Sequence, residues 1–451
     1  MIFRITYIFA VLFLLSSCTK EADVPTPKNG GADFSSFVSL GDSYTAGYTN
    51  GALSRDGQES SFASMMGAQL MNLSLETYSI PLLPEGKSVG SSLEGEMQLK
   101  VTTGGIQPVT TTGNPELLTD PSTWINANGP YHNLGIPGAR SYHLVAPEYG
   151  DPNQGVGNFN PYYARFASVP GVSTALSDAL AVERTFFSLW IGGNDVLGYA
   201  LAGGEAETSG MGSADITPVA AFTQSYAYML SQLTASGAKG VVGTIPAIDK
   251  LPFFSVVMPN MLALSAEQAA AMDAAYADYD AAAQQYGFEE MDFSAGANFF
   301  VIEDEANPVG MRQIKAGEKI LLTARTNITV AGWGSEVPIP DEYVLDENEL
   351  QSIEEATNTF NSIIENSANQ FDLAMVDLDV LMESTQEGLM IDGNIYSNAY
   401  ITGGVFSLDG IHTTGRGSAI IANAFIEAVN EKYGSSVPYV LVNDQTGIVF
   451  P

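Results

Sequence analysis

The sequence predicts an α/β fold in which helices cover both faces of a parallel central sheet. Short β-branched or aromatic runs that end in glycine alternate with longer segments whose apolar residues recur at the helical period. This alternation is typical of βαβ units and therefore of a three-layer α/β/α architecture. The composition, 45% hydrophobic and 10% aromatic, is that of a globular chain and excludes wholesale disorder.

The strands of the predicted sheet are short apolar runs bounded by turn residues. They are residues 37–40, 185–191, 240–246 and 373–378. The helices are longer segments with capping or stop residues, such as the capping box of Ser265 with Gln268 and the stop at Gly434. They are residues 60–71, 217–235, 265–285, a helix that opens at Asp346 with Glu349, and 417–433.

Two stretches break the alternation, and we interpret them as insertions into one domain. Residues 73–128 are rich in Gly, Thr, Ser and Pro and show no clear helix, so loops and short strands are expected there. Residues near 297–345 contain two strand-like runs, Lys319 to Thr323 and Ile328 to Val330. In the C-terminal tail, the apolar residues 437–442 are expected to form a strand or a packed segment.

The N-terminal residues have the features of an export signal. Met1 to Arg4 carries a positive charge, and the apolar run Ile5 to Leu15 is too short to span a bilayer. The following Leu15-Ser16-Ser17-Cys18 contains the only cysteine of the chain and resembles the lipobox of bacterial lipoproteins. The resemblance implies lipidation of Cys18 and an exported, membrane-anchored protein, with the outer membrane as the expected location. An ordinary signal peptide with an incidental cysteine is the alternative.

The charge balance excludes several classes of partner. The 51 acidic and 17 basic side chains give a formal net charge of −34, which would repel phosphate backbones, so no nucleic-acid partner is expected. A single cysteine excludes an internal disulfide framework and a cysteine-based zinc cluster. The acidic clusters at 273–280 and 346–349 lack the ligand pattern of a calcium loop, so they are interpreted as solvated helix faces and no metal is expected.

The turn Gly41-Asp42-Ser43 lies at the carboxyl end of the first strand, just before helical sequence. Ligands of open α/β sheets bind at this edge, and the N–H groups of a helix N-terminus stabilise negative charge. Ser43 is therefore a candidate nucleophile. The same tripeptide is also common as a plain turn.

A serine becomes a nucleophile only beside a base, and His412 is the candidate base. Asp409 lies three residues before it, so one short loop can place a carboxylate against the imidazole and fix its tautomer. The alternative for an isolated Asp-x-x-His is a surface capping pair. His132 and His143 have no such partner and are expected to be structural.

Ester hydrolysis also needs donors for the oxyanion of the tetrahedral intermediate. Asn194 follows a strand and offers a side-chain amide at the same edge of the sheet. Gly138, in the turn of residues 133–138, offers a backbone N–H that no side chain shields. Taken singly, both segments could be plain turns.

Together these segments resemble the four sequence blocks of the GDSL hydrolase family, also called SGNH hydrolases. The matching segments, in the family's order, are residues 41–43, 133–138, 193–195 and 409–412. The resemblance implies a flavodoxin-like fold with Ser43 as nucleophile, His412 as base and Asp409 as its orienter. It further implies an oxyanion hole made by the Ser43 N–H, the Gly138 N–H and the Asn194 side chain, without a metal or organic cofactor.

The chain departs from the family pattern at two positions. Tyr44 stands where the family name implies leucine, at a position without a chemical role. In the second block Gly135 competes with Gly138 for the oxyanion role. Gly138 is preferred because family members usually place a small residue after the functional glycine, as Ala139 is here.

The sequence thus predicts a hydrolase of carboxylic esters, with a small-molecule or lipid ester as substrate. One alternative is a carbohydrate O-acetyl esterase that acts on acetylated polysaccharide, and another is a thioesterase or lysophospholipase. A non-catalytic glycan-binding surface lipoprotein is the alternative from another class, although an intact Ser-Asp-His set argues against it. The predicted parts of the chain are a signal peptide (1–18), a tether (19–33), the hydrolase domain (34–433) and a tail (434–451).

Overall fold

The structure is a computed structural model that describes residues 26–206 and 209–451. The predicted export signal, Cys18 and the first part of the predicted tether lie outside the described residues. Among the helices of the described ranges, none is long and apolar enough to cross a membrane.

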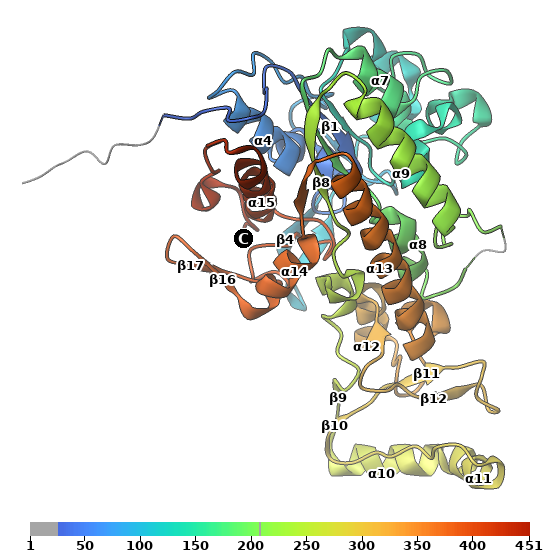
Figure 1. Cartoon of the computed structure of the whole chain (residues 1–451). Helices are drawn as coiled ribbons and strands as arrows, with labels where there is room; N and C mark the ends of the chain where they lie inside the picture. The colour runs from blue at the N-terminus through green and yellow to red at the C-terminus, as the bar shows by residue number, and fades with distance from the viewer. Residues whose placement is uncertain (1–25, 207–208) are drawn as a thin grey trace, which may run out of the picture.

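A five-stranded parallel sheet forms the centre of the molecule (Figure 1). Its strands are β1 (Phe37–Gly41), β6 (Asn133–Gly135), β7 (Phe186–Trp190), β8 (Lys239–Gly243) and β15 (Ala374–Val376). They lie in the order β15-β8-β7-β1-β6, and all four neighbouring pairs are parallel. Numbered along the chain this is the 2-1-3-4-5 order of flavodoxin-like sheets. The predicted α/β class with a parallel central sheet is confirmed.

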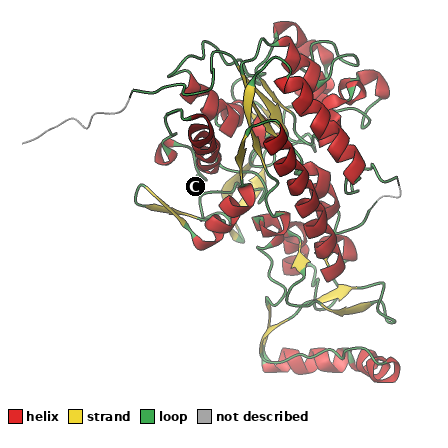
Figure 2. Ribbon diagram, in the orientation of Figure 1, coloured by secondary structure: helices red, strands yellow, loops and turns green. Residues whose placement is uncertain are grey.

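Helices cover both faces of this sheet, as Figure 2 shows. The central strands β1 and β7 are completely buried, which explains why they are continuous apolar runs in the sequence. On one face the rings of Phe62 and Phe425 meet at 4.8 Å, and on the other Phe222 stacks on Phe360 at 4.2 Å. The first pair joins α4 (Phe62–Leu70) to α15 (Gly415–Tyr433), and the second joins α9 (Val219–Thr234) to α13 (Glu347–Gln370), beside α7 (Ala175–Ala181).

The residues between α4 and β6 form loops and short antiparallel pairs. The elements of this region and of the segments beside it are α2 (Ser43–Ala46), β2 (Leu53–Ser54), α3 (Arg55–Glu59), β3 (Ser88–Val89), β4 (Met97–Thr102), β5 (Gly105–Thr110), α5 (Glu116–Thr119), α6 (Pro161–Ala164) and α8 (Asn194–Leu201). Strand β2 pairs with β3, and β4 pairs with β5 in a hairpin.

Residues 255–345, here named the arm, project away from the sheet, with α10 and α11 at the far end (Figure 1). The arm contains β9 (Leu262–Leu264), α10 (Ala266–Ala275), α11 (Ala277–Tyr286), β10 (Gly296–Asn298), β11 (Val301–Glu303), β12 (Met311–Gln313), β13 (Lys319–Ile320), α12 (Arg325–Val330) and β14 (Val344–Leu345). It has two small apolar clusters of its own, one around Ile302 and one around Tyr279. The arm therefore begins well before residue 297, where the sequence placed the second insertion.

Two predictions within the arm need correction. Residues 328–330 form part of helix α12 and not a strand, because only Ile328 packs against an apolar cluster while Val330 is 75% exposed. The helix predicted over 265–285 is divided at Tyr276 into α10 and α11. The tyrosine hydroxyl donates a hydrogen bond to the Ser335 carbonyl, which ties this break to another part of the arm.

The remaining predicted helices begin within two residues of their predicted starts. Asp346 and Glu349 form a reciprocal capping box at the start of α13. After β15 come α14 (Leu378–Glu387) and the hairpin of β16 (Leu389–Ile391) and β17 (Asn394–Tyr396). The tail is a packed segment and not a strand, because Asn423 of α15 exchanges two hydrogen bonds with the backbone of Val440.

Candidate active site

The carboxyl ends of three neighbouring strands lie level at the candidate site. In the sheet register Gly41 lies opposite both Gly135 of β6 and Trp190 of β7. A Cβ atom at Gly41 would lie 2.1 Å from Thr45 Oγ1 and 2.4 Å from the Trp190 carbonyl oxygen, so only glycine fits there. The segments that follow these strands carry the predicted site residues to one edge of the sheet.

Helix α2 begins directly after β1 and places Ser43 at its first position. Asp42 is the N-cap, and its carboxylate accepts a hydrogen bond of 3.0 Å from the Tyr44 N–H. The Ser43 N–H has no acceptor within the described part of the chain and is among the unpaired donors of this helix N-terminus.

Ser43, His412 and Asp409 form one hydrogen-bonded chain. Ser43 Oγ lies 2.9 Å from His412 Nε2, and His412 Nδ1 lies 3.0 Å from Asp409 Oδ2. Since an ionised carboxylate only accepts hydrogen bonds, Nδ1 carries the proton and Nε2 is left to accept from the serine hydroxyl. The Ser43 residue is 7% exposed and the imidazole 13% exposed, so the pair is shielded but reachable.

The Asp409 carboxylate is held by backbone donors from two parts of the chain. Its Oδ1 accepts from the N–H groups of Ile411 (2.9 Å) and His412 (2.8 Å), and its Oδ2 accepts from the Gly51 N–H (2.8 Å). Burial alone would raise the pKa of Asp409, but His412 and the backbone donors outweigh burial and hold this pKa below its usual value. The carboxylate therefore stays ionised beside the imidazole.

Two further carboxyl groups are buried at the same sheet edge. Burial raises the pKa of Asp42 to about 7, although the Tyr44 N–H opposes the rise. Burial likewise raises the pKa of Asp195 to about 6. The Asp195 carboxylate accepts hydrogen bonds from the Ser141 N–H (2.8 Å) and hydroxyl (2.7 Å), so it connects the segment after β6 with the segment after β7.

The structure distinguishes the two glycines that compete for the oxyanion role. A Cβ at Gly135 would lie 2.1 Å from the Ala46 nitrogen, and the Gly135 N–H is occupied by Asn133 Oδ1 at 2.9 Å. Gly138 has φ +78°, and within the described residues its N–H has no acceptor. Gly135 therefore serves the packing of β6 on α2, and the available N–H is that of Gly138.

Asn194 is the first residue of α8, directly after the turn that follows β7. Its side-chain nitrogen donates to the Ala139 carbonyl at 2.9 Å, which fixes the amide against the turn that contains Gly138. One N–H of an amide is used in this bond, and the second is left for another acceptor. The arrangement places two possible oxyanion donors in turns that are hydrogen-bonded to each other.

Two tyrosines to which the sequence analysis gave no role lie beside the histidine. The Tyr44 ring lies 5.3 Å from the imidazole between centroids, and the Tyr48 ring lies 4.8 Å from it. The sequence assigned no role to Tyr44 and did not select Tyr48 or Gly51. The tyrosine in place of leucine at position 44 is the signal that could have drawn attention to this region.

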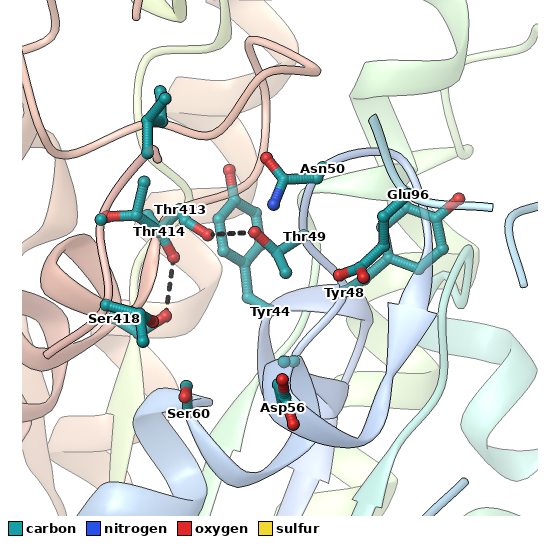
Figure 3. A pocket seen from close by; sticks show the side chains of 16 residues that line it. Tyr44, Tyr48, Thr49, Asn50, Asp56, Ser60, Glu96, Thr413, Thr414 and Ser418 are labelled. Carbon is teal, nitrogen blue, oxygen red and sulfur yellow. Dashed lines mark hydrogen bonds between the residues drawn. The ribbon is translucent and has the colours of Figure 1, made fainter. Parts of the chain in front are cut away.

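A polar cavity of about 170 Å³ lies beside these residues (Figure 3). Tyr44 and Tyr48 line it together with hydroxyl side chains and the carboxylates of Asp56 and Glu96, and no described lining residue is basic. A hydrogen bond of 2.9 Å from the Thr49 hydroxyl to the Thr413 carbonyl spans it. A smaller apolar cavity, about 30 Å³, shares Tyr44 and Thr413 with it and is otherwise lined mainly by Trp190 and aliphatic side chains.

The other two histidines have structural contacts. His132 Nδ1 lies 2.7 Å from the Ser79 hydroxyl, and the His143 ring stacks on Tyr149 at 4.0 Å. Burial lowers the pKa of both rings, that of His143 to about 3. Over residues 26–206 and 209–451, no group of three or more His, Cys, Asp or Glu side chains is arranged to hold a metal ion.

Comparison with known proteins gives one family and three matching solved chains, two of which are described here. The family model described as GDSL-like lipase/acylhydrolase matches residues 37–425. A protein described as a GDSL-like lipase from Parabacteroides merdae ATCC 43184 aligns at 11% identity over 90% of this chain and 99% of its own, with a TM-score of 0.35. An extracellular lipase from Streptomyces rimosus aligns at 12% identity over 88% of this chain and 98% of its own, with a TM-score of 0.30. No curated protein matches the sequence.

Proposed function

The chain belongs to the GDSL-like lipase/acylhydrolase family, and on that premise we propose that it hydrolyses carboxylic esters through an acyl-enzyme on Ser43. The observation that carries the proposal is the continuous chain of hydrogen bonds from Asp409 through His412 to Ser43. A serine hydroxyl against the acceptor nitrogen of an oriented imidazole is the arrangement that nucleophilic catalysis requires.

Acylation begins when Ser43 Oγ attacks the ester carbonyl carbon and His412 Nε2 takes the hydroxyl proton. Asp409 stabilises the imidazolium that results, since its pKa keeps it ionised. The carbonyl oxygen becomes an oxyanion, to which the Ser43 N–H, the Gly138 N–H and the Asn194 amide each donate a hydrogen bond in this proposal. When the tetrahedral intermediate collapses, the bond to the alcohol oxygen breaks and His412 returns the proton to that oxygen.

Deacylation repeats these steps with water as the nucleophile. His412 Nε2 takes a proton from water as its oxygen attacks the acyl carbon, and the same donors hold the second oxyanion. Collapse of this intermediate breaks the bond to Ser43 Oγ, which receives the proton from His412. The carboxylic acid leaves, and Ser43 and His412 return to their starting protonation states.

The test is hydrolysis of p-nitrophenyl esters of increasing acyl length by the wild-type protein and by Ser43→Ala. We expect the substitution to lower kcat by roughly 10⁴-fold or more, with the thermal unfolding temperature unchanged because only one hydroxyl group is removed and the Cβ atom remains. A wild-type protein that is inert across the series, or a fully active Ser43→Ala protein, would refute the proposal.

The polar cavity, which is lined by Tyr44 and Tyr48 but not by Ser43 or His412, favours a second candidate, a carbohydrate O-acetyl esterase. Two tyrosine rings, several hydroxyl groups and the carboxylates of Asp56 and Glu96 suit a neutral, hydroxyl-rich alcohol such as a sugar. Release of acetate from acetylated xylan, with little hydrolysis of long-chain esters, supports this candidate, and the reverse preference contradicts it.

The non-catalytic alternative, a glycan-binding surface protein, is the least supported. A protein that has lost catalysis has no reason to keep Ser43, His412 and Asp409 in hydrogen-bond contact. Binding of a glycan without turnover of any ester in the series would revive this alternative.

We also propose that the protein is exported and held in the outer membrane by lipid at Cys18. The support is the sequence of residues 1–18, in which a charged start and a short apolar run precede the cysteine. Metabolic labelling with palmitate, followed by membrane fractionation, tests this. We expect label and membrane association in the wild type and neither in Cys18→Ser, and equal labelling of both proteins would contradict the proposal.

A further inference from the structure

The loop that carries Asp409 and His412 has little regular structure of its own. Between β17 and α15 the described residues form no helix and no sheet strand, and isolated bridges such as Phe406 with Thr413 are the only pairing there. Within the loop the Ser407 N–H donates to the His412 carbonyl at 2.8 Å. These internal bonds hold Asp409 and His412 together, and contacts from outside the loop hold the pair within reach of Ser43.

We propose that Tyr44 and Tyr48 are positioning residues that hold the Asp409–His412 loop against the nucleophile. The proposal rests on the function proposed above and concerns how that site keeps its geometry. The two rings flank the imidazole, with centroids 5.3 Å and 4.8 Å from it. Neither hydroxyl bonds to Ser43, His412 or Asp409 side chains, so both residues act through other groups.

Tyr44, the residue after the nucleophile, contacts Ile411, the residue before the base. Its hydroxyl donates a hydrogen bond of 2.8 Å to the Ile411 carbonyl. Its ring packs between the imidazole and Trp190, whose centroid lies 4.8 Å away. One side chain thus couples α2, the end of β7 and the histidine loop.

Tyr48 reaches the same loop through the carboxylate. Its hydroxyl donates to the Gly51 carbonyl at 2.5 Å, and the Gly51 N–H donates to Asp409 Oδ2 at 2.8 Å. Between them, Asn50 bonds to Ser407 and Leu408 of the loop at 3.0 and 3.1 Å. Residues 48–51 therefore brace Asp409 at Oδ2, the same oxygen that accepts from His412 Nδ1.

The space around Tyr44 makes its ring hard to replace. The polar cavity of about 170 Å³ and the apolar cavity of about 30 Å³ both border this ring, so neighbouring side chains do not fill its place. Leucine, the residue that the family name implies, would lose the bond to Ile411 and leave the imidazole without a ring on that side. Small displacements of a base are costly, since a misplacement of about 1 Å can lower a rate by about 100-fold.

The experiment compares Tyr44→Leu, Tyr44→Phe, Tyr48→Leu and Tyr48→Phe on p-nitrophenyl acetate. We expect each leucine variant to lower kcat by roughly 10- to 100-fold with KM changed less than about 3-fold. Each phenylalanine variant should lie between the leucine variant and the wild type, because the ring beside the imidazole remains while the hydroxyl bond to the loop is lost. The rate of Ser43 modification by a fluorophosphonate should fall in parallel with kcat. Tyr228→Leu, at an exposed tyrosine of α9, is the control and should match the wild type.

The outcomes separate this inference from the proposed function. A wild-type protein without esterase activity or fluorophosphonate reaction would refute the proposed function itself. An active wild type with leucine variants of unchanged kcat, or with losses confined to KM, would overturn the positioning role alone. If Tyr44→Leu does not fold, the test rests on the half-buried Tyr48. A folded Tyr48→Leu protein with unchanged kcat overturns the positioning role. A reduced kcat that Tyr48→Phe partly restores supports it.

Discussion

The catalytic edge of the sheet and the arm differ in how the chain fixes a side chain in space. At the catalytic edge every residue of β1 and β7 is buried, and each segment of the site is held by partners from distant parts of the sequence. In the arm, α10 buries only Ala269 and α11 buries only Tyr279 and Ala283. Burial on all sides allows a side chain few positions, and that restriction is what a catalytic hydrogen-bond chain needs.

Each of the two regions also contains a carboxylate paired with a basic side chain, but only one of the two pairs lies beside the nucleophile. Asp409 pairs with His412 at the catalytic edge, and in the arm Glu318, which is 1% exposed, pairs with Arg312 through two bonds of 2.7 and 2.8 Å. Both carboxylates are partnered and largely shielded, since the Asp409 side chain is 10% exposed. Only Asp409 is bonded to a base that contacts the nucleophile. We therefore expect only the charge of Asp409 to affect kcat.

The largest expected effect comes from neutralising these two carboxylates. Asp409→Asn should lower kcat by roughly 10³- to 10⁴-fold, because an amide can stabilise the wrong tautomer of His412 and cannot neutralise the imidazolium. The matched Glu318→Gln should leave kcat on p-nitrophenyl acetate within about 2-fold and should affect stability instead. Steady-state kinetics together with thermal unfolding measure both. Equal losses of kcat in the two variants would show that the arm is not separate from the chemistry.

A smaller effect is expected from placing a charge in each region's core. Ala422 of α15 and Ala283 of α11 are 0% and 1% exposed. Ala422→Asp should destabilise the whole domain by about 4 kcal/mol or more, since an unpaired carboxylate is buried in the main core. Ala283→Asp should loosen only the arm and leave ester hydrolysis within about 2-fold.

Hydrogen exchange of the two variants locates the damage. For Ala283→Asp, loss of protection should be confined to the arm, where α11 packs in its own small apolar cluster. Loss of protection in β1 or β7 of that variant would contradict the independence of the two regions.

The smallest effect concerns pH and the buried Asp42. Its pKa is about 7 in the fold against 3.8 when unfolded, so its contribution to stability is fully present below pH 3.8 and is lost as pH rises through 7. Between pH 5 and 8 the free energy of unfolding should fall, and Asp42→Asn should reduce that fall by about 2 kcal/mol. Asp273→Asn, on exposed α10, is the control variant. Denaturant titrations at several pH values measure this. A free energy of unfolding that rises between pH 5 and 8 would contradict the prediction.

The elements of the central sheet could be predicted from the sequence more accurately than the elements of the arm. Strands such as 37–40 and 185–191 were predictable because a strand that is buried on both faces requires a continuous apolar run. In the arm, 328–330 was wrongly predicted as a strand, since three β-branched positions cannot reveal that only Ile328 is packed. The division of 265–285 at Tyr276 depends on a contact with Ser335 that no local pattern contains.

In the candidate site, the catalytic residues could be predicted from the sequence, but the side chains that position them could not. Ser43, Asp409 and His412 lie in short motifs at strand ends, so sequence could predict that they meet, and the structure brings them into hydrogen-bond contact. The contacts of Tyr44 and Tyr48 with the imidazole arise from the path of a loop. Aromatic residues are common in loops and cores alike, so their spacing carried no signal for this role.

The separation of Ser43 from His412 by 369 positions has a consequence for the order of folding. Contacts between such distant parts of a chain form slowly, because a very long loop must close before the contact is made. A nascent chain that has not yet reached residue 409 can contain all five sheet strands and still lack the base. The return of esterase activity during refolding should therefore lag behind the return of helical signal, and it would report the docking of the last segment rather than the formation of the sheet.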